Sequence, residues 1–270
     1  MKILKFDEFV NEGQYMPHYT TSSSWDDYEI RSKEDLQEKI QEIIDKTHPK
    51  KGDTIDLNHL DVSRVEDMSK LFYDGERNID FTEYNFNISK WDVSSVTSMH
   101  RMFFCCENFN CDLSKWNVSN VKDMRYMFAD CVSFKGDLSR WDVSNVTDMS
   151  GMFDACEKFN CDLSKWNVSN VKDMNRMFFC CENFNCDLSR WDVSRVEDMH
   201  GMFDGCKNFN CDLSKWNVSN VADMKCMFYG CKNFNCDLSM WDVSNVKDMN
   251  HMFDGCNSLK NIPDWYLDYD

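Results

Sequence analysis

The chain has 270 residues and a net charge of −17, with 47 acidic residues against 30 basic ones. Apolar residues make up 42% of the sequence, which is enough to bury a large core and excludes a disordered or collagen-like chain. The acidic balance disfavours nucleic acid and anionic lipid as partners, and no apolar run approaches the roughly 18 residues of a membrane-spanning helix.

The start of the chain does not have the pattern of a secretory signal. Asp7 and Glu8 interrupt the stretch that would have to be apolar for export. Residues 1–31 are polar and uneven in composition, and we expect them to form a mobile segment. Without an export signal, the chain is expected to stay in the reducing cytoplasm or another intracellular compartment.

Residues 32–52 are predicted to form a capping helix and a linker. Ser32 and Asp35 have the spacing of a capping box, and Pro49 ends the helical pattern. The apolar face of this helix comprises Leu36, Ile40, Ile43 and Ile44.

Tryptophan marks a repeat with a constant period of 25 residues. It occurs at Trp91, Trp116, Trp141, Trp166, Trp191, Trp216 and Trp241. A divergent unit precedes these seven, with Leu60 in the tryptophan position 31 residues before Trp91. The six additional residues lie between Glu76 and Asn87. Because fixed periods of this length are typical of stacked repeat architectures, we expect about eight coils over residues 53–258.

The residue spacing within each unit predicts a short strand followed by a helical turn. Trp116 and Val118 alternate with polar residues, as in a strand with one buried face. Asp123 follows as a potential N-cap, and the apolar residues after it are spaced as on one helical face. These residues are Met124, Met127 and Phe128. Residues 259–270 depart from the repeat and are expected to form a C-terminal cap.

The segment 112–124, Asp-Leu-Ser-Lys-Trp-Asn-Val-Ser-Asn-Val-Lys-Asp-Met, is followed by Met127-Phe128 and resembles the BspA-like leucine-rich repeat. This repeat is also described as a mycoplasma-type lipoprotein repeat of unknown function. The resemblance runs from Asp53 onward and implies an α/β fold, a leucine-rich-repeat solenoid. It also implies a non-enzymatic protein without cofactors. Some members of the family adhere to host proteins at cell surfaces, which for this chain would require an unrecognised export route.

A second resemblance concerns the N-terminus. The stretch from Met1-Lys2 to Phe9-Val10-Asn11-Glu12-Gly13 is similar to the leader peptides of internal capsid proteins of large tailed phages. Such leaders are removed by a prohead protease after an apolar-x-Glu site. The resemblance implies cleavage before Gly13 and a structural or packaged role in a phage virion.

The 15 cysteines fall mainly into two phases of the repeat. The first phase comprises Cys106, Cys131, Cys156, Cys181, Cys206, Cys231 and Cys256, and the second comprises Cys111, Cys161, Cys186, Cys211 and Cys236 with Gly136 in the gap. Both phases suit small buried side chains, and a line of evenly spaced thiols does not gather four sulfurs around zinc. We therefore predict reduced, metal-free cysteines. Cys105, Cys180 and Cys226 lie outside both phases and are predicted to be the more reactive thiols.

Serine occupies one phase in every coil, which predicts a buried ladder of hydroxyl groups. These residues are Ser63, Ser94, Ser119, Ser144, Ser169, Ser194, Ser219 and Ser244. No histidine recurs beside them, so the pattern indicates no catalytic triad and we do not expect an enzyme.

Two columns that flank the tryptophans are predicted to form a binding site on the concave face. Before the tryptophans come Lys90, Lys115, Arg140, Lys165, Arg190 and Lys215; after them come Asp92, Asn117, Asp142, Asn167, Asp192, Asn217 and Asp242. With Asp61, six cations face five carboxylates, so this strip is nearly neutral on an acidic chain. We expect these positions to have no role in the core and to bind an unknown protein or peptide, for which an acidic segment is the candidate. The alternative is that the charges only keep the sheet soluble.

Overall fold

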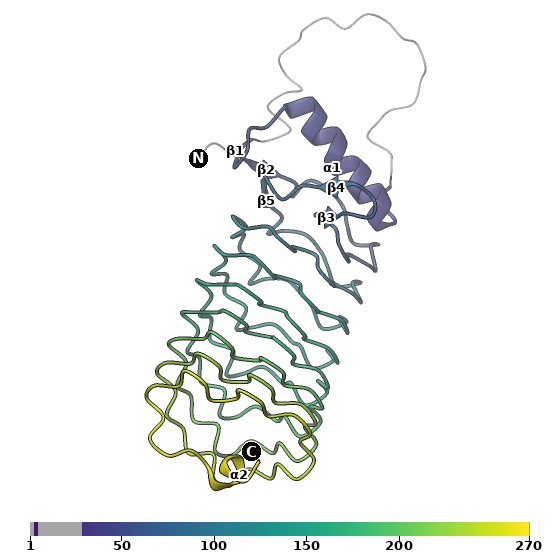
Figure 1. The fold of residues 1–270 in the computed structure, drawn as a ribbon. Coiled ribbons are helices and arrows are strands. Elements are labelled where there is room, and N and C mark those ends of the chain that lie inside the picture. The colour runs from purple at the N-terminus through teal and green to yellow at the C-terminus, as the bar shows by residue number, and fades with distance from the viewer. Residues whose placement is uncertain (1–2, 5–28, 270) are drawn as a thin grey trace, which may run out of the picture.

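The computed structural model describes residues 3–4 and 29–269 (Figure 1). Within them, one helix lies at each end of a long stack of coils: α1 (Lys33–Thr47) and α2 (Asp264–Leu267). The predicted mobile segment 1–31 and the predicted cleavage before Gly13 fall almost entirely outside the described residues.

Five short strands lie toward the N-terminal end of the stack. They are β1 (Ile3–Leu4), β2 (Thr54–Asp56), β3 (Tyr73–Asp74), β4 (Ile79–Asp80) and β5 (Asn85–Asn87). The first, second and fifth form a parallel sheet in the order β1-β2-β5, while β3 and β4 pair antiparallel. The extra residues of the divergent first unit therefore lie in the β3–β4 hairpin and the connection to β5.

Helix α1 begins at the predicted capping box. The backbone N–H of Asp35 donates to the Ser32 side chain, and the N–H of Ser32 donates to the Asp35 carboxylate, each at 3.1 Å. The apolar face of α1 is buried against the first coil. On the same face, the buried Gln37 side chain donates to the carbonyls of Lys70 and Leu71 at 3.3 and 3.1 Å.

The 25-residue units stack in register along one axis (Figure 1). Parallel bridges join one position of each unit to the same position of the next: Asp67, Ser98, Asp123, Asp148, Asp173, Asp198, Asp223 and Asp248. The seven tryptophans of the 25-residue period are buried, as predicted, with only 4–5% of their surface exposed. Each indole N–H crosses to the preceding coil, as when Trp166 donates to the Leu138 carbonyl at 3.0 Å.

The principal inter-coil hydrogen bonds lie after the bridge position. The N–H groups of Met174, Arg176, Phe178 and Cys180 donate at 3.0, 2.8, 2.9 and 2.6 Å to carbonyls of the following coil. Arg176 and Cys180 have left-handed backbones, with φ of 53° and 54°. Left-handed residues turn successive peptide planes so that these four N–H groups all point along the stack. The same four bonds recur from coil to coil.

The strand and helical turn predicted within each unit do not form. Between Ile88 and Pro263 the described chain contains bends, turns and isolated bridges but no helix or extended strand. Tyr126, for example, has a φ of 53°, which breaks a right-handed helix at the position where the apolar spacing predicts one. Its N–H bonds to Ser150 of the next coil instead of to a residue one turn back. The i, i+3, i+4 spacing thus reflects inward-facing turns.

Aromatic rings form continuous columns through the core. Phe128, Phe153 and Phe178 stack at centroid distances of 5.7 and 5.6 Å, with nearly parallel ring planes. A second phenylalanine column runs beside them, and Phe153 lies 4.1 Å from Phe159 within its own coil. Because every ring contacts the coils before and after it, no unit has a core of its own.

We expect Trp166→Phe to lower the free energy of unfolding by about 1–3 kcal/mol, since it removes the indole donor of the buried Leu138 carbonyl, which then keeps only the Trp141 N–H. Urea denaturation followed by circular dichroism would measure this change. Trp265→Phe is the matched control: Trp265 makes the same bond to Leu238 but is half-buried, so water can replace the lost donor. An equal loss in both variants would contradict the proposed role of burial.

Candidate functional site

The six predicted cations lie on one face in successive coils, and we call them the cation strip. They are Lys90, Lys115, Arg140, Lys165, Arg190 and Lys215, and all are exposed. None of them forms an ion pair with another described residue. In the last coil an exposed methionine, Met240, takes the place of the cation.

The column that follows the tryptophans is exposed, but it has a structural role. The side-chain oxygens of Asn117 and Asp142 accept the backbone N–H of the serine two residues later, at 3.2 and 3.0 Å. Hydrogen bonds from the Ser144 hydroxyl and N–H hold the pKa of Asp142 below its usual value. The column thus lies outside the core, but its members are not free of structural work, because each one closes a turn of its own coil.

The serine column does not form a buried hydroxyl ladder. Its members are half-buried or exposed, and their backbone groups make the recurring bonds. The N–H of Ser119 donates to Asn117, and its carbonyl accepts from the Asn145 side chain of the next coil at 2.7 Å. Serine suits this position because it is small and tolerates the turn.

A further row of carboxylates borders the cation strip. It comprises Asp112, Asp137, Asp162, Asp187, Asp212 and Asp237, all exposed. Hydrogen bonds from Ser114 lower the pKa of Asp112, and the positive charge of Lys115 lowers it further. From the two columns beside the tryptophans alone, this surface was predicted to have a net charge near zero. With the neighbouring aspartate row included, its net charge is negative. Any anionic ligand on the strip would have to compete with carboxylates of the chain itself.

The two main cysteine phases serve as inter-coil hydrogen-bonding groups. The thiol of Cys181 donates to the Phe153 carbonyl of the preceding coil at 2.9 Å, and its neighbours in the phase repeat this bond. In the second phase the thiol sulfur of Cys186 accepts the Leu163 N–H at 3.0 Å. All 15 cysteines lie in the described chain as free thiols.

Cys105, Cys180 and Cys226 do not have the environment of reactive thiols. All three are half-buried. Burial and the nearby Asp130 carboxylate raise the pKa of Cys105 to about 11, and burial also raises the pKa of Cys180 and Cys226. Because the thiolate is the nucleophile, the prediction that these three are especially reactive is not supported.

A further set of positions, which we call the variable face, differs from coil to coil and was not predicted. Arginine, tyrosine, glycine, cysteine and histidine occupy positions 101, 126, 151, 176, 201, 226 and 251, and phenylalanine, alanine, aspartate and tyrosine occupy the positions three residues later. The Arg176 guanidinium lies 3.9 Å from the centre of the Phe179 ring and 3.0 Å from the Asp154 carboxylate. This face could have been predicted from the sequence, because its residue types differ between units whereas most other positions are constant.

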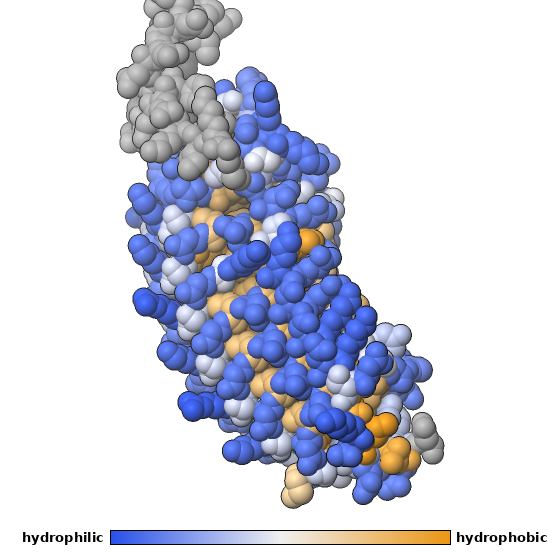
Figure 2. All heavy atoms as spheres, turned by 90° about the vertical axis from the view of Figure 1, so that its left-hand side faces the viewer, coloured by the Kyte–Doolittle hydropathy of each residue, from blue (hydrophilic) through white to orange (hydrophobic). Residues whose placement is uncertain are grey.

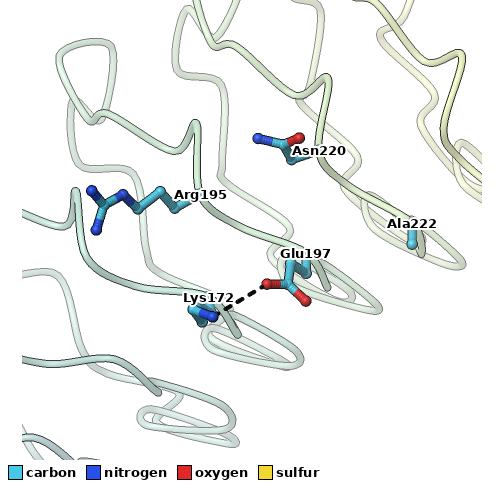
Figure 3. Close-up of a pocket in the computed structure, with 5 residues that line it drawn as sticks. All are labelled: Lys172, Arg195, Glu197, Asn220 and Ala222. Atoms are coloured by element: carbon cyan, nitrogen blue, oxygen red, sulfur yellow. Dashed lines mark ion pairs between the residues drawn. The ribbon is translucent and has the colours of Figure 1, made fainter.

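A shallow open hollow of about 620 Å³ lies between neighbouring coils (Figure 3). Its lining residues are Lys172, Arg195, Glu197, Asn220 and Ala222. Lys172 and Glu197 form an ion pair at 3.6 Å across the hollow. The lining brings together no nucleophile and base, so its chemistry is that of a polar surface.

No group of three or more histidine, cysteine, aspartate or glutamate residues in the described chain is arranged to hold a metal ion. Neither α1 nor α2, the two helices of the described residues, has the length and apolar character needed to cross a membrane.

Recurring 25-residue units stacked in register define a repeat protein. The chain belongs to the family described as "Mycoplasma protein of unknown function, DUF285", which matches residues 38–166 and 148–266. This confirms the mycoplasma-type repeat at the level of the family. Comparison with curated proteins and with solved structures gives no significant match.

From Asp123 onward, the aspartates at the bridge position form a partly buried row, in which Asp173 is the clearest case. Burial raises the pKa of Asp173 to about 6, and the charges of Asp148 and Asp198 add to this effect. The folded state therefore binds a proton here more tightly than the unfolded state does. This contribution stabilises the protein as pH falls from about 6 to about 4 and is lost as pH rises through the folded pKa.

Asp173→Asn should therefore stabilise the protein at pH 7 by about 1 kcal/mol, because it removes a partly buried charge and keeps an oxygen for the Asn175 N–H. The gain should shrink toward pH 4 in urea denaturation at a series of pH values. Asp162→Asn is the control, since Ser164 lowers the pKa of Asp162. A gain at pH 7 for the control, or none for Asp173→Asn, would contradict this account.

The thiols should react slowly in the folded protein. Burial and raised pKa values leave little thiolate near neutral pH, so we expect few cysteines to react quickly with Ellman's reagent. In concentrated guanidinium chloride all 15 should react. Rapid native labelling of Cys105, Cys180 and Cys226 ahead of the others, located by mass spectrometry, would restore the prediction made from sequence.

Proposed function

We propose that the protein is a non-enzymatic leucine-rich-repeat solenoid of the BspA-like type, an α/β fold in the sense of that class. In this proposal it is a scaffold that binds another protein along the cation strip. The family match supports a repeat protein, and the ordered stack supplies an extended, regular surface of the kind that repeat proteins use for binding.

The observation that supports this proposal is that the cations of the strip form no ion pairs with other described residues. On other faces, Arg125 lies 2.6 Å from Asp123, Arg176 lies 3.0 Å from Asp154 and Lys172 lies 3.6 Å from Glu197. The cation strip forms no such pair among the described residues although each member is exposed. Its charges are therefore available to carboxylates of a partner at little cost in broken contacts.

The geometry favours an extended partner segment. Equivalent backbone positions of adjacent coils pair in a parallel register, which places successive cations about 4.8 Å apart along the stack. An acidic segment running along the axis could contact several of them in turn. The bordering aspartate row weakens this attraction, so we expect binding to be modest and sensitive to salt.

The test uses fluorescein-labelled poly-L-glutamate as the acidic probe and fluorescence anisotropy as the readout. In the quadruple variant K115Q/R140Q/K165Q/R190Q we expect the dissociation constant to rise at least about tenfold, mainly through slower association. The control, K122Q/K158Q/K232Q/K247Q, removes the same charge at exposed positions outside the strip. Equal weakening in both variants would show a general charge effect, and no weakening in the first would place the ligand elsewhere.

A further inference from the structure

The inter-coil hydrogen bonds described above give the stack a direction. In every interior coil the four aligned N–H groups point toward the C-terminal end, and the carbonyls of the same peptides point toward the N-terminal end. The seventh coil follows this pattern, with Met224, Cys226, Phe228 and Gly230 donating to the last coil at 2.8, 3.0, 3.0 and 2.7 Å. One end of the stack therefore presents acceptors and the other presents donors.

The acceptor end is closed by the chain itself. Helix α1 covers it with buried apolar side chains, and Gln37, only 3% exposed, donates its amide to the Leu71 carbonyl. Leu71 holds the position in the first coil whose carbonyl would otherwise accept from a preceding coil. The N-terminal end thus has both an apolar cover and a hydrogen-bond donor.

The donor end is open. We call the N–H groups of Met249, His251, Phe253 and Gly255 the donor row; these correspond to the four N–H groups of the seventh coil, and none has an acceptor in the described chain. His251 and Gly255 have left-handed backbones, with φ of 61° and 77°, as at the same positions of the interior coils. The donor row is therefore already arranged to bond to a following segment.

The C-terminal cap covers a different side of the last coil. Trp265 continues the tryptophan column, with its indole N–H donating to Leu238 at 3.0 Å and its ring stacked on Trp241. Tyr266 packs edge-on against Phe253. No residue of α2 accepts from the donor row. The cap thus replaces the tryptophan half of a further coil and leaves the hydrogen-bonding half uncovered.

Apolar side chains are exposed around this end of the molecule. The large hydrophobic residues exposed in the described chain are Tyr229, Met240, Ile262 and Leu267, and all belong to the last two coils or the cap. In Figure 2 strongly hydrophobic groups gather at the lower end of the stack, and paler hydrophobic groups form a stripe along the face between hydrophilic ones. An open hydrogen-bonding edge with apolar surroundings favours a polypeptide partner.

A second copy of the chain does not fit the donor row. Head-to-tail stacking would require the acceptor end, which α1 already covers. Tail-to-tail pairing would place donors against donors. A free anion is also disfavoured, because Asp254 and Asp248 border the row and the Asp254 carboxylate already contacts the His251 ring at 2.9 Å.

We infer that the C-terminal coil binds an extended segment of another protein, whose backbone carbonyls accept hydrogen bonds from the donor row and whose apolar side chains pack beside the cap. The segment would occupy the place of a ninth coil. This site is separate from the cation strip, and neither proposal depends on the other.

Amide hydrogen exchange resolved by NMR tests the open edge in the full-length protein. We expect the four amides of the donor row to exchange at least about a hundredfold faster than Met224, Cys226, Phe228 and Gly230, which occupy the same positions one coil earlier. Protection of both sets to the same degree in the monomer would overturn the inference.

The binding probe is a synthetic peptide with the sequence of residues 195–205. In the intact protein this segment supplies the carbonyls of Asp198, His200, Met202 and Asp204 to the coil before it. We expect it to slow exchange of the donor row at least about tenfold, whereas a scrambled peptide does not. The strip variant K115Q/R140Q/K165Q/R190Q should respond equally, which separates this site from the proposed function.

Three outcomes would contradict the inference. The peptide could shift resonances elsewhere and leave the donor row unprotected. Phosphate or sulfate alone could protect the row, which would indicate an anion site. Sedimentation could show self-association that protects the row without any peptide, which would make a second copy the occupant.

Discussion

The stack depends on the hydrogen bonds that each coil donates to the next through four aligned N–H groups. Left-handed residues such as Arg176 and Cys180 make this alignment possible, because they turn alternate peptide planes into the stack direction. A helix would satisfy the same N–H groups within one unit and leave neighbouring units joined only by side chains. Here the backbone itself joins the units, so the coils keep one register from the first to the last.

The polar residues of the repeat also hold the coils together. Aspartate or asparagine closes turns within a coil, tryptophan donates its indole N–H to the coil before, and the two cysteine phases donate to or accept from backbone groups of neighbouring coils. These side chains bond to backbone N–H and C=O groups that would have bonded to each other in a regular strand or helix. Recurrence of a polar residue in this protein is therefore mainly a sign of structure, and the surfaces left for recognition are the cation strip, the variable face and the C-terminal end.

The direction of the hydrogen bonds makes the two ends chemically different. At the N-terminal end the peptide carbonyls point outward, and there Gln37 donates to the Leu71 carbonyl while the apolar face of α1 covers the coil. The C-terminal end exposes N–H groups, and α2 covers only the tryptophan side. A stack of this kind cannot extend itself by simple self-association, because its acceptor end is occupied. Helix α1 prevents a further coil from being added at the N-terminal end, while the N–H groups at the C-terminal end can still donate to a partner.

The sequence by itself determined the period, the number of coils, the capping box at Ser32 and Asp35 and the burial of tryptophan, because each depends on local spacing and on apolar character that recurs in every unit. It did not determine the path of the chain inside a coil. The spacing of Met124, Met127 and Phe128 suits a helix and a series of inward-facing turns equally well, and only contact with the next coil decides between them. The roles of Cys181 and the donor row were likewise decided by the tertiary structure, since each depends on which backbone group of a neighbouring coil lies opposite. A linear pattern records which side chains are apolar, but it does not record the direction in which a peptide N–H points.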